Sequence, residues 1–261
     1  MNTLVFDIET VPDVELGRRL YGLDGLDDAA VAQAMFAKQR ALKASDVLPP
    51  PQQRVVAISV VLRTRDGLKL FSLGDVQAPE RELVQRFFDG LERFSPTLVS
   101  WNGSGFDLPV LQYRALRHGV NAQRYWELGD SDREFRYNNY LSRYHWRHID
   151  LMDVLSGYGA SGRASLDLAA QLVGLPGKLG IGGAQVWPAY LRGELGAIRD
   201  YCELDVLNTY LVYLRFQLVR GELDPKSYQG ELAVVEEKLA QSDRPHLLEY
   251  LERWRTSRHA G

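Results

Sequence analysis

Two acidic residues, Asp7 and Glu9, lie two positions apart at the end of a short apolar segment, residues 3–8, of this 261-residue chain. The β-branched and apolar residues of this segment predict a buried strand. Side chains at positions i and i+2 of a strand point to the same face, so both carboxylates should leave the strand together. Neighbouring carboxylates repel each other and lose hydration on burial unless a cation neutralises them. The pair indicates a cation site, and a solvated strand end is the alternative.

A third acidic residue, Asp107, ends the segment 100–107, SWNGSGFD, whose glycines predict a tight turn between a strand and a helix. The helix is expected to begin at Asp107. Because aspartate is a preferred N-cap residue, capping of this helix is the alternative role for its carboxylate.

The fourth acidic residue, Asp205, lies four residues after Tyr201 within a predicted long helix, so the two share one helix face. Aspartate is a poor residue for a helix interior, and apolar neighbours surround this one. The alternative is a solvated helix face that carries Asp200, Glu203 and Asp205. Glu203 points to another part of the helical wheel and is not expected to belong to the site.

These carboxylates, Asp7, Glu9, Asp107 and Asp205, form the predicted metal-ligand set. Oxygen ligands suit Mg²⁺ or Mn²⁺, whereas Zn²⁺ prefers histidine and cysteine. The chain has five histidines and one cysteine, and no HxxxH motif occurs in it.

The segments FDIET (residues 6–10), WNGSGFD (101–107) and YCELD (201–205) resemble the three exonuclease motifs of the DEDD superfamily. The Tyr-x-x-x-Asp pattern of the third motif resembles the tyrosine-bearing (DEDDy) branch. The second motif is most similar to that of the proofreading domain of family B DNA polymerases. The chain resembles the stand-alone polymerase-B-like 3′–5′ exonucleases of bacteria, from residue 3 to about residue 216.

The resemblance implies two-metal phosphodiester hydrolysis by the catalytic residues Asp7, Glu9, Asp107, Tyr201 and Asp205. Asp7, Glu9 and Asp205 would hold the ion that carries the attacking water. Asp7 would also bridge to a second ion, on which Asp107 acts through water. Tyr201 would orient the water rather than take its proton, since a tyrosine pKa near 10 makes it a poor base at neutral pH.

Substrate contacts are expected at Thr10, Asn102, Phe106 and Lys178. Lys178 could meet a backbone phosphate or remain a solvated loop lysine, and Asn102 could position the terminal nucleotide or hold the turn. His148 and Asp150 are expected to close the last strand rather than to touch substrate.

The predicted elements follow the order strand, strand, strand, helix, strand, helix, strand, helices, which implies a mixed sheet with helices on both faces. The expected strands are 3–8, 54–63, 68–73, 97–101 and 147–150, and the expected helices are 27–45, 80–94, 107–118, 165–173, 194–219 and most of 228–257. The resemblance implies an α/β, ribonuclease H-like fold with a five-stranded mixed sheet. Residues 1–219 form the expected exonuclease domain, with a helical insertion at 26–50 and an aromatic, basic loop at 119–147. Residues 220–261 form an expected C-terminal helical extension.

The expected loop interleaves arginines with aromatic residues, a composition that suits stacking on unpaired bases and contact with phosphates. Packing of these aromatic side chains onto the sheet is the alternative. The whole chain carries 31 Lys+Arg against 34 Asp+Glu, so any nucleic-acid contact must be local.

We expect a 3′–5′ exonuclease on single-stranded DNA that releases nucleoside monophosphates. An exoribonuclease, an inactive nucleic-acid-binding module and a Mg²⁺ phosphohydrolase acting on nucleotides are the alternatives. One cysteine and the absence of a signal-peptide pattern or a long apolar run favour a cytoplasmic protein without membrane contact. Protein partners are not indicated.

Overall fold

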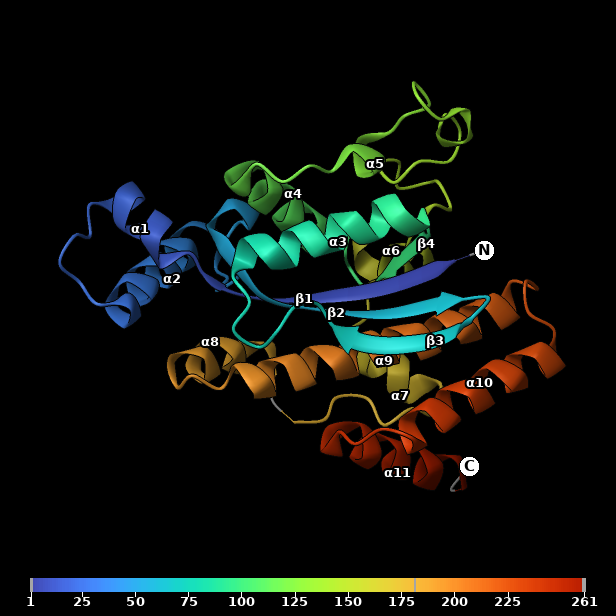
Figure 1. Cartoon of the computed structure of the whole chain (residues 1–261). Helices are drawn as coiled ribbons and strands as arrows, with labels where there is room; N and C mark the ends of the chain where they lie inside the picture. The colour runs from blue at the N-terminus through green and yellow to red at the C-terminus, as the bar shows by residue number, and fades with distance from the viewer. Residues whose placement is uncertain (1, 181, 260–261) are drawn as a thin grey trace.

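One mixed sheet forms the centre of the computed structural model, which describes residues 2–180 and 182–259 (Figure 1). Met1, the first residue of the predicted exonuclease domain, lies outside the described residues. So do residues 260–261, the end of the predicted C-terminal extension. Within the described residues the sheet has five strands in the order β3-β2-β1-β4-β5. β1 pairs with β2, and β2 with β3, in antiparallel orientation, whereas β4 is parallel to β1 and β5 is parallel to β4. The strands are β1 (Thr3–Pro12), β2 (Gln53–Thr64), β3 (Gly67–Ser72), β4 (Thr97–Ser100) and β5 (His148–Asp150).

The first strand extends beyond the predicted segment 3–8 and ends at Pro12. Its pairing with β2 shifts register between Glu9 and Thr10, so the strand continues through a bulge. Bulges change the direction of a strand and of the side chains around it. This bulge lies directly after Glu9.

The two faces of β1 belong to different cores. Leu4, Phe6 and Ile8 pack with α3 (Glu80–Phe94) and α4 (Asp107–His118), whereas Val5 packs with α9 (Leu195–Val219). Figure 1 shows α3 and α4 on one side of the sheet and α9 on the other. Since side chains alternate along a strand, Asp7 and Glu9 leave β1 on the α9 face.

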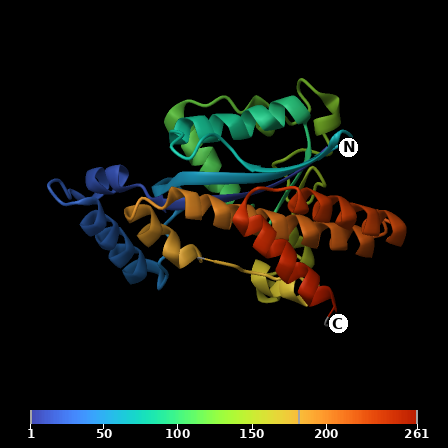
Figure 2. The ribbon, with the colours of Figure 1, turned by 60° about the horizontal axis from the view of Figure 1, so that its bottom comes forward.

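The C-terminal helices pack on the same side as α9. Tyr228 of α10 (Pro225–Ala240) and Tyr250 and Trp254 of α11 (Pro245–His259) share a core with Val5 of β1. Figure 2 shows both helices lying against α9. The predicted domain boundary at 219/220 coincides with the end of α9, and the helices beyond it share the core of the sheet.

A helical excursion separates β1 from β2. Its α2 (Asp28–Lys43) matches the predicted helix 27–45, and the carboxylate of Asp27 accepts the Ala30 N–H as an N-cap. α1 (Val14–Tyr21), for which the sequence pattern gives no prediction, begins after the cap residue Asp13. The remaining short elements are η1 (Pro50–Gln52), α5 (Gln123–Trp126), η2 (Arg133–Phe135), α6 (Leu151–Leu155), η3 (Ala160–Gly162), α7 (Leu166–Leu172) and α8 (Gly183–Leu191).

Burial divides the aromatic residues of the 119–147 loop into two groups. Tyr125, Phe135 and Tyr140 belong to the core on the α3 face of the sheet, so the substrate-contact hypothesis is wrong for them. Tyr137 and Tyr144 are 82% and 67% exposed. Only exposed rings can stack on a strand from solution, and the packing alternative holds for the buried ones.

None of the helices within the described ranges combines the length and apolarity required to cross a bilayer.

Candidate active site

Asp7 and Glu9 bring their carboxylates close together on the α9 face of β1. One carboxylate oxygen of each residue and the thiol sulfur of Cys202, on α9, all lie within 4.8 Å of one another. The Cys202 Sγ lies 3.4 Å from the Asp7 carbonyl oxygen and 3.5 Å from Asp7 Oδ2. Burial, and then the charges of Asp7 and Glu9, raise the pKa of Cys202 well above its usual value. The thiol therefore stays protonated and donates toward Asp7, a role that its apolar sequence context did not indicate.

The predicted acidic residues interact electrostatically in the folded chain. Burial raises the pKa of Asp7 well above its usual value, and the charges of Asp107, Glu9 and Asp205 raise it further. Burial likewise raises the pKa of Glu9, with added repulsion from Asp205 and Asp107. Carboxylates from three separate segments of the sequence therefore repel one another in the folded chain.

Asp107 is the first residue of α4, and its helix begins without a side-chain cap at Phe106. The capping alternative for Asp107 is therefore wrong. Burial raises the pKa of Asp107 to about 7, against opposing hydrogen bonds from its own backbone N–H and from that of Ile8. The bond from Ile8 places the Asp107 carboxylate beside β1, next to the strand position between Asp7 and Glu9.

The turn before Asp107 is held by Asp150, at the end of β5. Asp150 Oδ1 accepts the Asn102 N–H and its Oδ2 accepts the Ser104 N–H, each at 2.9 Å. Asn102 has a φ of 63°, in the left-handed region that asparagine tolerates. A Cβ at Gly103 would lie 2.2 Å from the Ser100 hydroxyl, so glycine is required there. Asp150 thus does more than end a strand, because it holds the turn that leads into Asp107.

His148, the first residue of β5, links this strand to β4 as an uncharged side chain. Its Nε2 hydrogen-bonds the Ser100 hydroxyl at 2.8 Å, and burial lowers the pKa of His148 to about 4. The imidazole is therefore neutral at pH 7. Its buried place on β5 agrees with the expectation that it closes the strand.

Helix α4 is held at its far end by a buried ionic cluster. Arg114 donates to Asp13 Oδ2 at 2.6 Å and to both carboxylate oxygens of Glu80, its Nε lying 2.6 Å from Glu80 Oε1. The side chains of Arg114 and Asp13 are each 3% exposed. The cluster joins the starts of α1 and α3 to the helix that carries Asp107.

On α9, Tyr201 donates a hydrogen bond from its hydroxyl to Asp205, one turn further along the helix. Burial, followed by the charges of Asp205 and Glu9, raises the pKa of Tyr201. Burial also raises the pKa of Asp205 to about 6, although the Tyr201 hydroxyl and Lys178 favour its charged form. A tyrosine that stays protonated can orient a ligand but cannot act as a general base.

The predicted substrate-contact residues differ in their surroundings. The Nζ of Lys178 lies 5.1 Å from the centre of the Tyr201 ring, and its charge lowers the pKa of both Glu9 and Asp205. The hydroxyl of Thr10 donates to Gln53 Oε1 at 2.9 Å, and Phe106 is partly buried against the core of the α3 face. Among the predicted substrate contacts, Lys178 is therefore the one whose positive charge stabilises the ionised carboxylates of the site.

Glu203 is buried at 4% exposure, so the solvated-face alternative is wrong for this residue, whereas Asp200 on the same helix is exposed. Its Oε2 accepts from Arg244 Nη1 at 2.5 Å and lies 2.9 Å from His246 Nε2, and the Ser72 hydroxyl donates to Oε1 at 2.8 Å. Burial opposes ionisation of Glu203, but His246, Arg244 and Ser72 outweigh it and lower its pKa. The helix that carries Tyr201 and Asp205 is thus tied to β3 and to the start of α11.

The donor set fits a hard divalent cation. Carboxylate oxygens are the ligands that Mg²⁺ and Mn²⁺ prefer. Burial raises the pKa values of Asp7, Glu9, Asp107 and Asp205, and Lys178 and the Tyr201 hydroxyl offset this effect only in part at Glu9 and Asp205. A bound cation would supply the missing charge.

The chain matches, over residues 45–254, the family described as predicted 3′–5′ exonucleases related to the exonuclease domain of PolB. The matched range includes Asp107, Tyr201 and Asp205 and begins after Asp7 and Glu9.

Known DNA polymerases are similar to parts of the chain. The catalytic subunit of DNA polymerase epsilon from Kluyveromyces lactis is 28% identical over 149 residues, which are 52% of this chain and 6% of the polymerase. A DNA polymerase from Archaeoglobus fulgidus is 24% identical over 166 residues, 62% of this chain and 20% of that protein. The chain therefore spans a small part of the length of both relatives.

The structure of the family B DNA polymerase from Pyrobaculum calidifontis superposes with a TM-score of 0.50 at 20% identity, over 84% of this chain and 24% of the polymerase chain. This likeness, with the mixed five-stranded sheet of the described residues, confirms the predicted ribonuclease H-like fold. Because the family match covers most of the sequence, the protein belongs to the predicted 3′–5′ exonucleases related to the exonuclease domain of family B DNA polymerases.

Proposed function

We propose that the protein is a 3′–5′ exonuclease of the tyrosine-bearing DEDD branch, which hydrolyses phosphodiester bonds at the 3′ end of single-stranded DNA with two Mg²⁺ or Mn²⁺ ions. The products are nucleoside monophosphates. The observation that carries this proposal is the pair of carboxylates of Asp7 and Glu9, which lie within 4.8 Å of each other on the α9 face of β1, where the charges of Asp107 and Asp205 raise their pKa values. The family membership adds independent support for the polarity of cleavage.

The carboxylates hold the ions in this proposal. Asp7, Glu9 and Asp205 would hold one ion, and Asp7 and Asp107 would act on the other. When bound, such ions activate water and neutralise the charge that develops on the scissile phosphate and the leaving oxygen. The Cys202 thiol donates to Asp7 and, being protonated, acts as an orienting donor rather than as a ligand.

Tyr201 and Lys178 act on the reacting groups from the α9 side of the site. The Tyr201 hydroxyl remains protonated and donates to Asp205, so its oxygen can accept a hydrogen bond from the attacking water and orient it. Lys178 is exposed at the rim of the carboxylate cluster, where its charge can meet a backbone phosphate. Asn102 and Phe106, in the turn before Asp107, are the proposed contacts of the terminal nucleotide.

The test uses DNA and RNA oligonucleotides of one sequence, labelled at the 5′ end, with Mg²⁺, with Mn²⁺ and with EDTA. We expect a DNA ladder that shortens from the 3′ end in the presence of either metal. Asp7→Asn and Asp205→Asn should abolish cleavage, whereas the exposed loop variant Asp24→Asn should not change it. Faster cleavage of RNA would identify an exoribonuclease, and internal fragments would contradict the exonuclease proposal. Binding without cleavage would indicate an inactive module.

A further inference from the structure

A small cleft lies beside the turn that leads into Asp107. It has a volume of about 330 Å³, and its walls include Ser104 and Gly105 of that turn and the side chains of Arg143 and Arg163. We call it the arginine cleft. Because the same turn carries the proposed contacts of the terminal nucleotide, the cleft lies next to the place where a bound strand would end.

One buried carboxylate holds both arginines of the cleft. Arg143 Nη2 donates to Asp153 Oδ2 at 2.7 Å, and Arg163 Nη2 donates to Asp153 Oδ1 at 2.9 Å. The Asp153 side chain is 4% exposed, whereas those of Arg143 and Arg163 are 41% and 40% exposed. A guanidinium has five N–H donors, so each arginine keeps donors for a ligand after its bond to Asp153. The carboxylate therefore fixes two accessible guanidinium groups side by side.

The arginine cleft carries an excess of positive charge. Asp153 is the one acidic residue among the described residues that line it, so two guanidinium groups share a single negative charge. His148, which also lines the cleft, is neutral at pH 7 because burial lowers its pKa to about 4. The uncompensated charge favours an anionic group on a ligand of the cleft.

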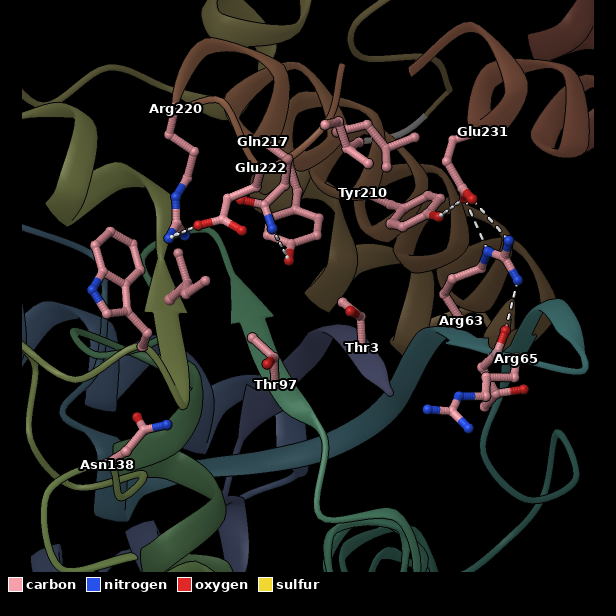
Figure 3. A pocket seen from close by; sticks show the side chains of 16 residues that line it. Thr3, Arg63, Arg65, Thr97, Asn138, Tyr210, Gln217, Arg220, Glu222 and Glu231 are labelled. Carbon is pink, nitrogen blue, oxygen red and sulfur yellow. Dashed lines mark hydrogen bonds and ion pairs between the residues drawn. The ribbon is translucent and has the colours of Figure 1, made fainter. Parts of the chain in front are cut away.

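The larger cavity drawn in Figure 3 offers a comparison. It has a volume of about 780 Å³, and in it Arg63 pairs with Glu231 at 2.8 Å and Arg220 with Glu222 at 2.9 Å. Each of these two guanidinium groups has a carboxylate of its own. In the arginine cleft, by contrast, one arginine would suffice to neutralise Asp153, and the second adds charge that the buried carboxylate does not require.

Asp150 ties the arginine cleft to the carboxylate site. It accepts the N–H groups of Asn102 and Ser104 in the turn before Asp107. Its side chain also caps α6, where it accepts the Asp153 N–H at 3.4 Å. The residue that holds the two arginines therefore lies on a helix whose start is fixed to the turn. Few and short contacts thus connect the guanidinium groups to the helix that carries Asp107.

An exposed tyrosine adjoins the arginine pair. The Tyr144 ring is 67% exposed, and its centre lies 5.8 Å from the Arg143 guanidinium carbon. An edge-to-face contact with Tyr158, at 5.0 Å between the ring centres, restrains it. Unpaired bases stack on accessible aromatic rings, whereas paired bases are already stacked within a duplex. A ring of this kind beside an excess cation suits a single strand better than a free anion.

From these contacts we propose that Arg143 and Arg163 bind a backbone phosphate of the single-stranded substrate, upstream of the nucleotide that is removed. The inference rests on the proposed function, because it takes the 3′ end of the strand to lie at the carboxylates. Phosphate oxygens accept paired hydrogen bonds from guanidinium groups, and two such groups held side by side can meet one phosphate. Tyr144 offers its ring to a neighbouring base. The arginines act in binding and not in the chemical step.

The binding test uses a 5′-fluorescein-labelled oligothymidylate of about twelve nucleotides with the whole protein in EDTA, so that the strand stays intact. Fluorescence anisotropy measures its Kd. Arg143→Gln and Arg163→Gln should each raise Kd roughly fivefold or more. Each should also lower the slope of log Kd against log salt concentration by about 0.7, the value for one lost phosphate contact on a single strand. The control Arg255→Gln, which removes an exposed arginine paired with Glu236 on the other side of the sheet, should change neither quantity.

A cleavage test in Mg²⁺ compares the same oligonucleotide with the dinucleotide TpT, whose one phosphate is the scissile one. With the oligonucleotide, Arg163→Gln should raise KM and leave kcat nearly unchanged, and the loss in kcat/KM should exceed the loss with TpT. Equal losses would mean that the variant disturbs the turn into Asp107, which would overturn the inference. Wild-type protein that binds without cleaving would contradict the nuclease function alone, and binding by the variants would still decide the inference.

Two binding results would also overturn it. The first is absence of oligonucleotide binding by the wild-type protein. The second is a Kd and a salt dependence that Arg143→Gln and Arg163→Gln change no more than Arg255→Gln does. Each single variant leaves Asp153 paired with the other arginine, so both are expected to fold. Urea unfolding of the variants separates lost binding from lost structure.

Discussion

Replacing Asp205 by asparagine should stabilise the metal-free protein while it abolishes the proposed hydrolysis. Burial raises the pKa of Asp205 from 3.8 to about 6. One pKa unit corresponds to about 1.4 kcal/mol, so ionised Asp205 lowers the free energy of unfolding by up to about 3 kcal/mol at pH 8. Asparagine has nearly the same shape and removes this charge.

The effect has a defined pH window. Below pH 4 the carboxyl is protonated in the folded and unfolded chains, so its ionisation has no effect on stability. Between about pH 4 and pH 6 the unfolded chain loses its proton first, which lowers the stability of the folded protein as the pH rises. The gain from Asp205→Asn should therefore be small at pH 4, grow through this window and remain constant at pH 8.

Urea unfolding followed by far-UV circular dichroism, in EDTA at pH 4, 6 and 8, measures this gain. The exposed variant Asp24→Asn controls for loss of an acidic residue elsewhere. Adding Mg²⁺ at about 100 times its dissociation constant should stabilise the wild-type protein by about 2.7 kcal/mol and the Asp205→Asn variant by less. An Asp205→Asn protein that is less stable than wild type at pH 8 in EDTA would refute the reasoning.

Three further perturbations test the contacts around the site. Tyr201→Phe should slow cleavage roughly tenfold or more and leave Mg²⁺ stabilisation intact, as single-turnover kinetics and unfolding measurements would show; an unchanged rate would remove its orienting role. Arg114→Ala should lower the free energy of unfolding in urea by about 3–5 kcal/mol, because it leaves buried carboxylates unpaired. The control Arg86→Ala, which removes an exposed ion pair, should lower it by at most about 0.5 kcal/mol. Equal costs would contradict the buried-cluster argument. Arg244→Ala should lower the unfolding free energy by about 1–3 kcal/mol, since it removes a charged partner of buried Glu203, and no change would contradict that contact.

Local sequence patterns predict the elements that carry their own signals. The predicted helix 107–118 has the observed bounds because its residues have helical spacing and a glycine follows it in the left-handed conformation. The β2–β3 hairpin follows from two apolar runs around a short turn. The pattern does not reveal α1, although Asp13 caps it and Gly22 ends it, since eight residues show too little periodicity.

Residues of the same type or charge lie in different environments where tertiary packing alone decides their burial and their partners. Tyr137 and Tyr140 lie three positions apart in one loop, yet the first is 82% exposed and the second 2%. Glu203 and Asp205 are both acids on α9, but only Glu203 meets Arg244 and His246, which lie about forty positions further along the chain. Nothing local distinguishes the two tyrosines, and the helical wheel separates Glu203 from Asp205 without showing which groups either acid meets.

The sequence by itself determined the strands, the longer helices and the acidic residues that suit a divalent cation, because these depend on residue type and on spacing within short segments. The fold class followed from the resemblance of the three motifs to a known superfamily. The tertiary structure alone decided which acids repel one another, which are paired with arginine and how the turn before Asp107 is held by Asp150. Electrostatic free energies depend on the distance between groups and on their exposure to water. Both quantities are set only when segments far apart in the chain pack together.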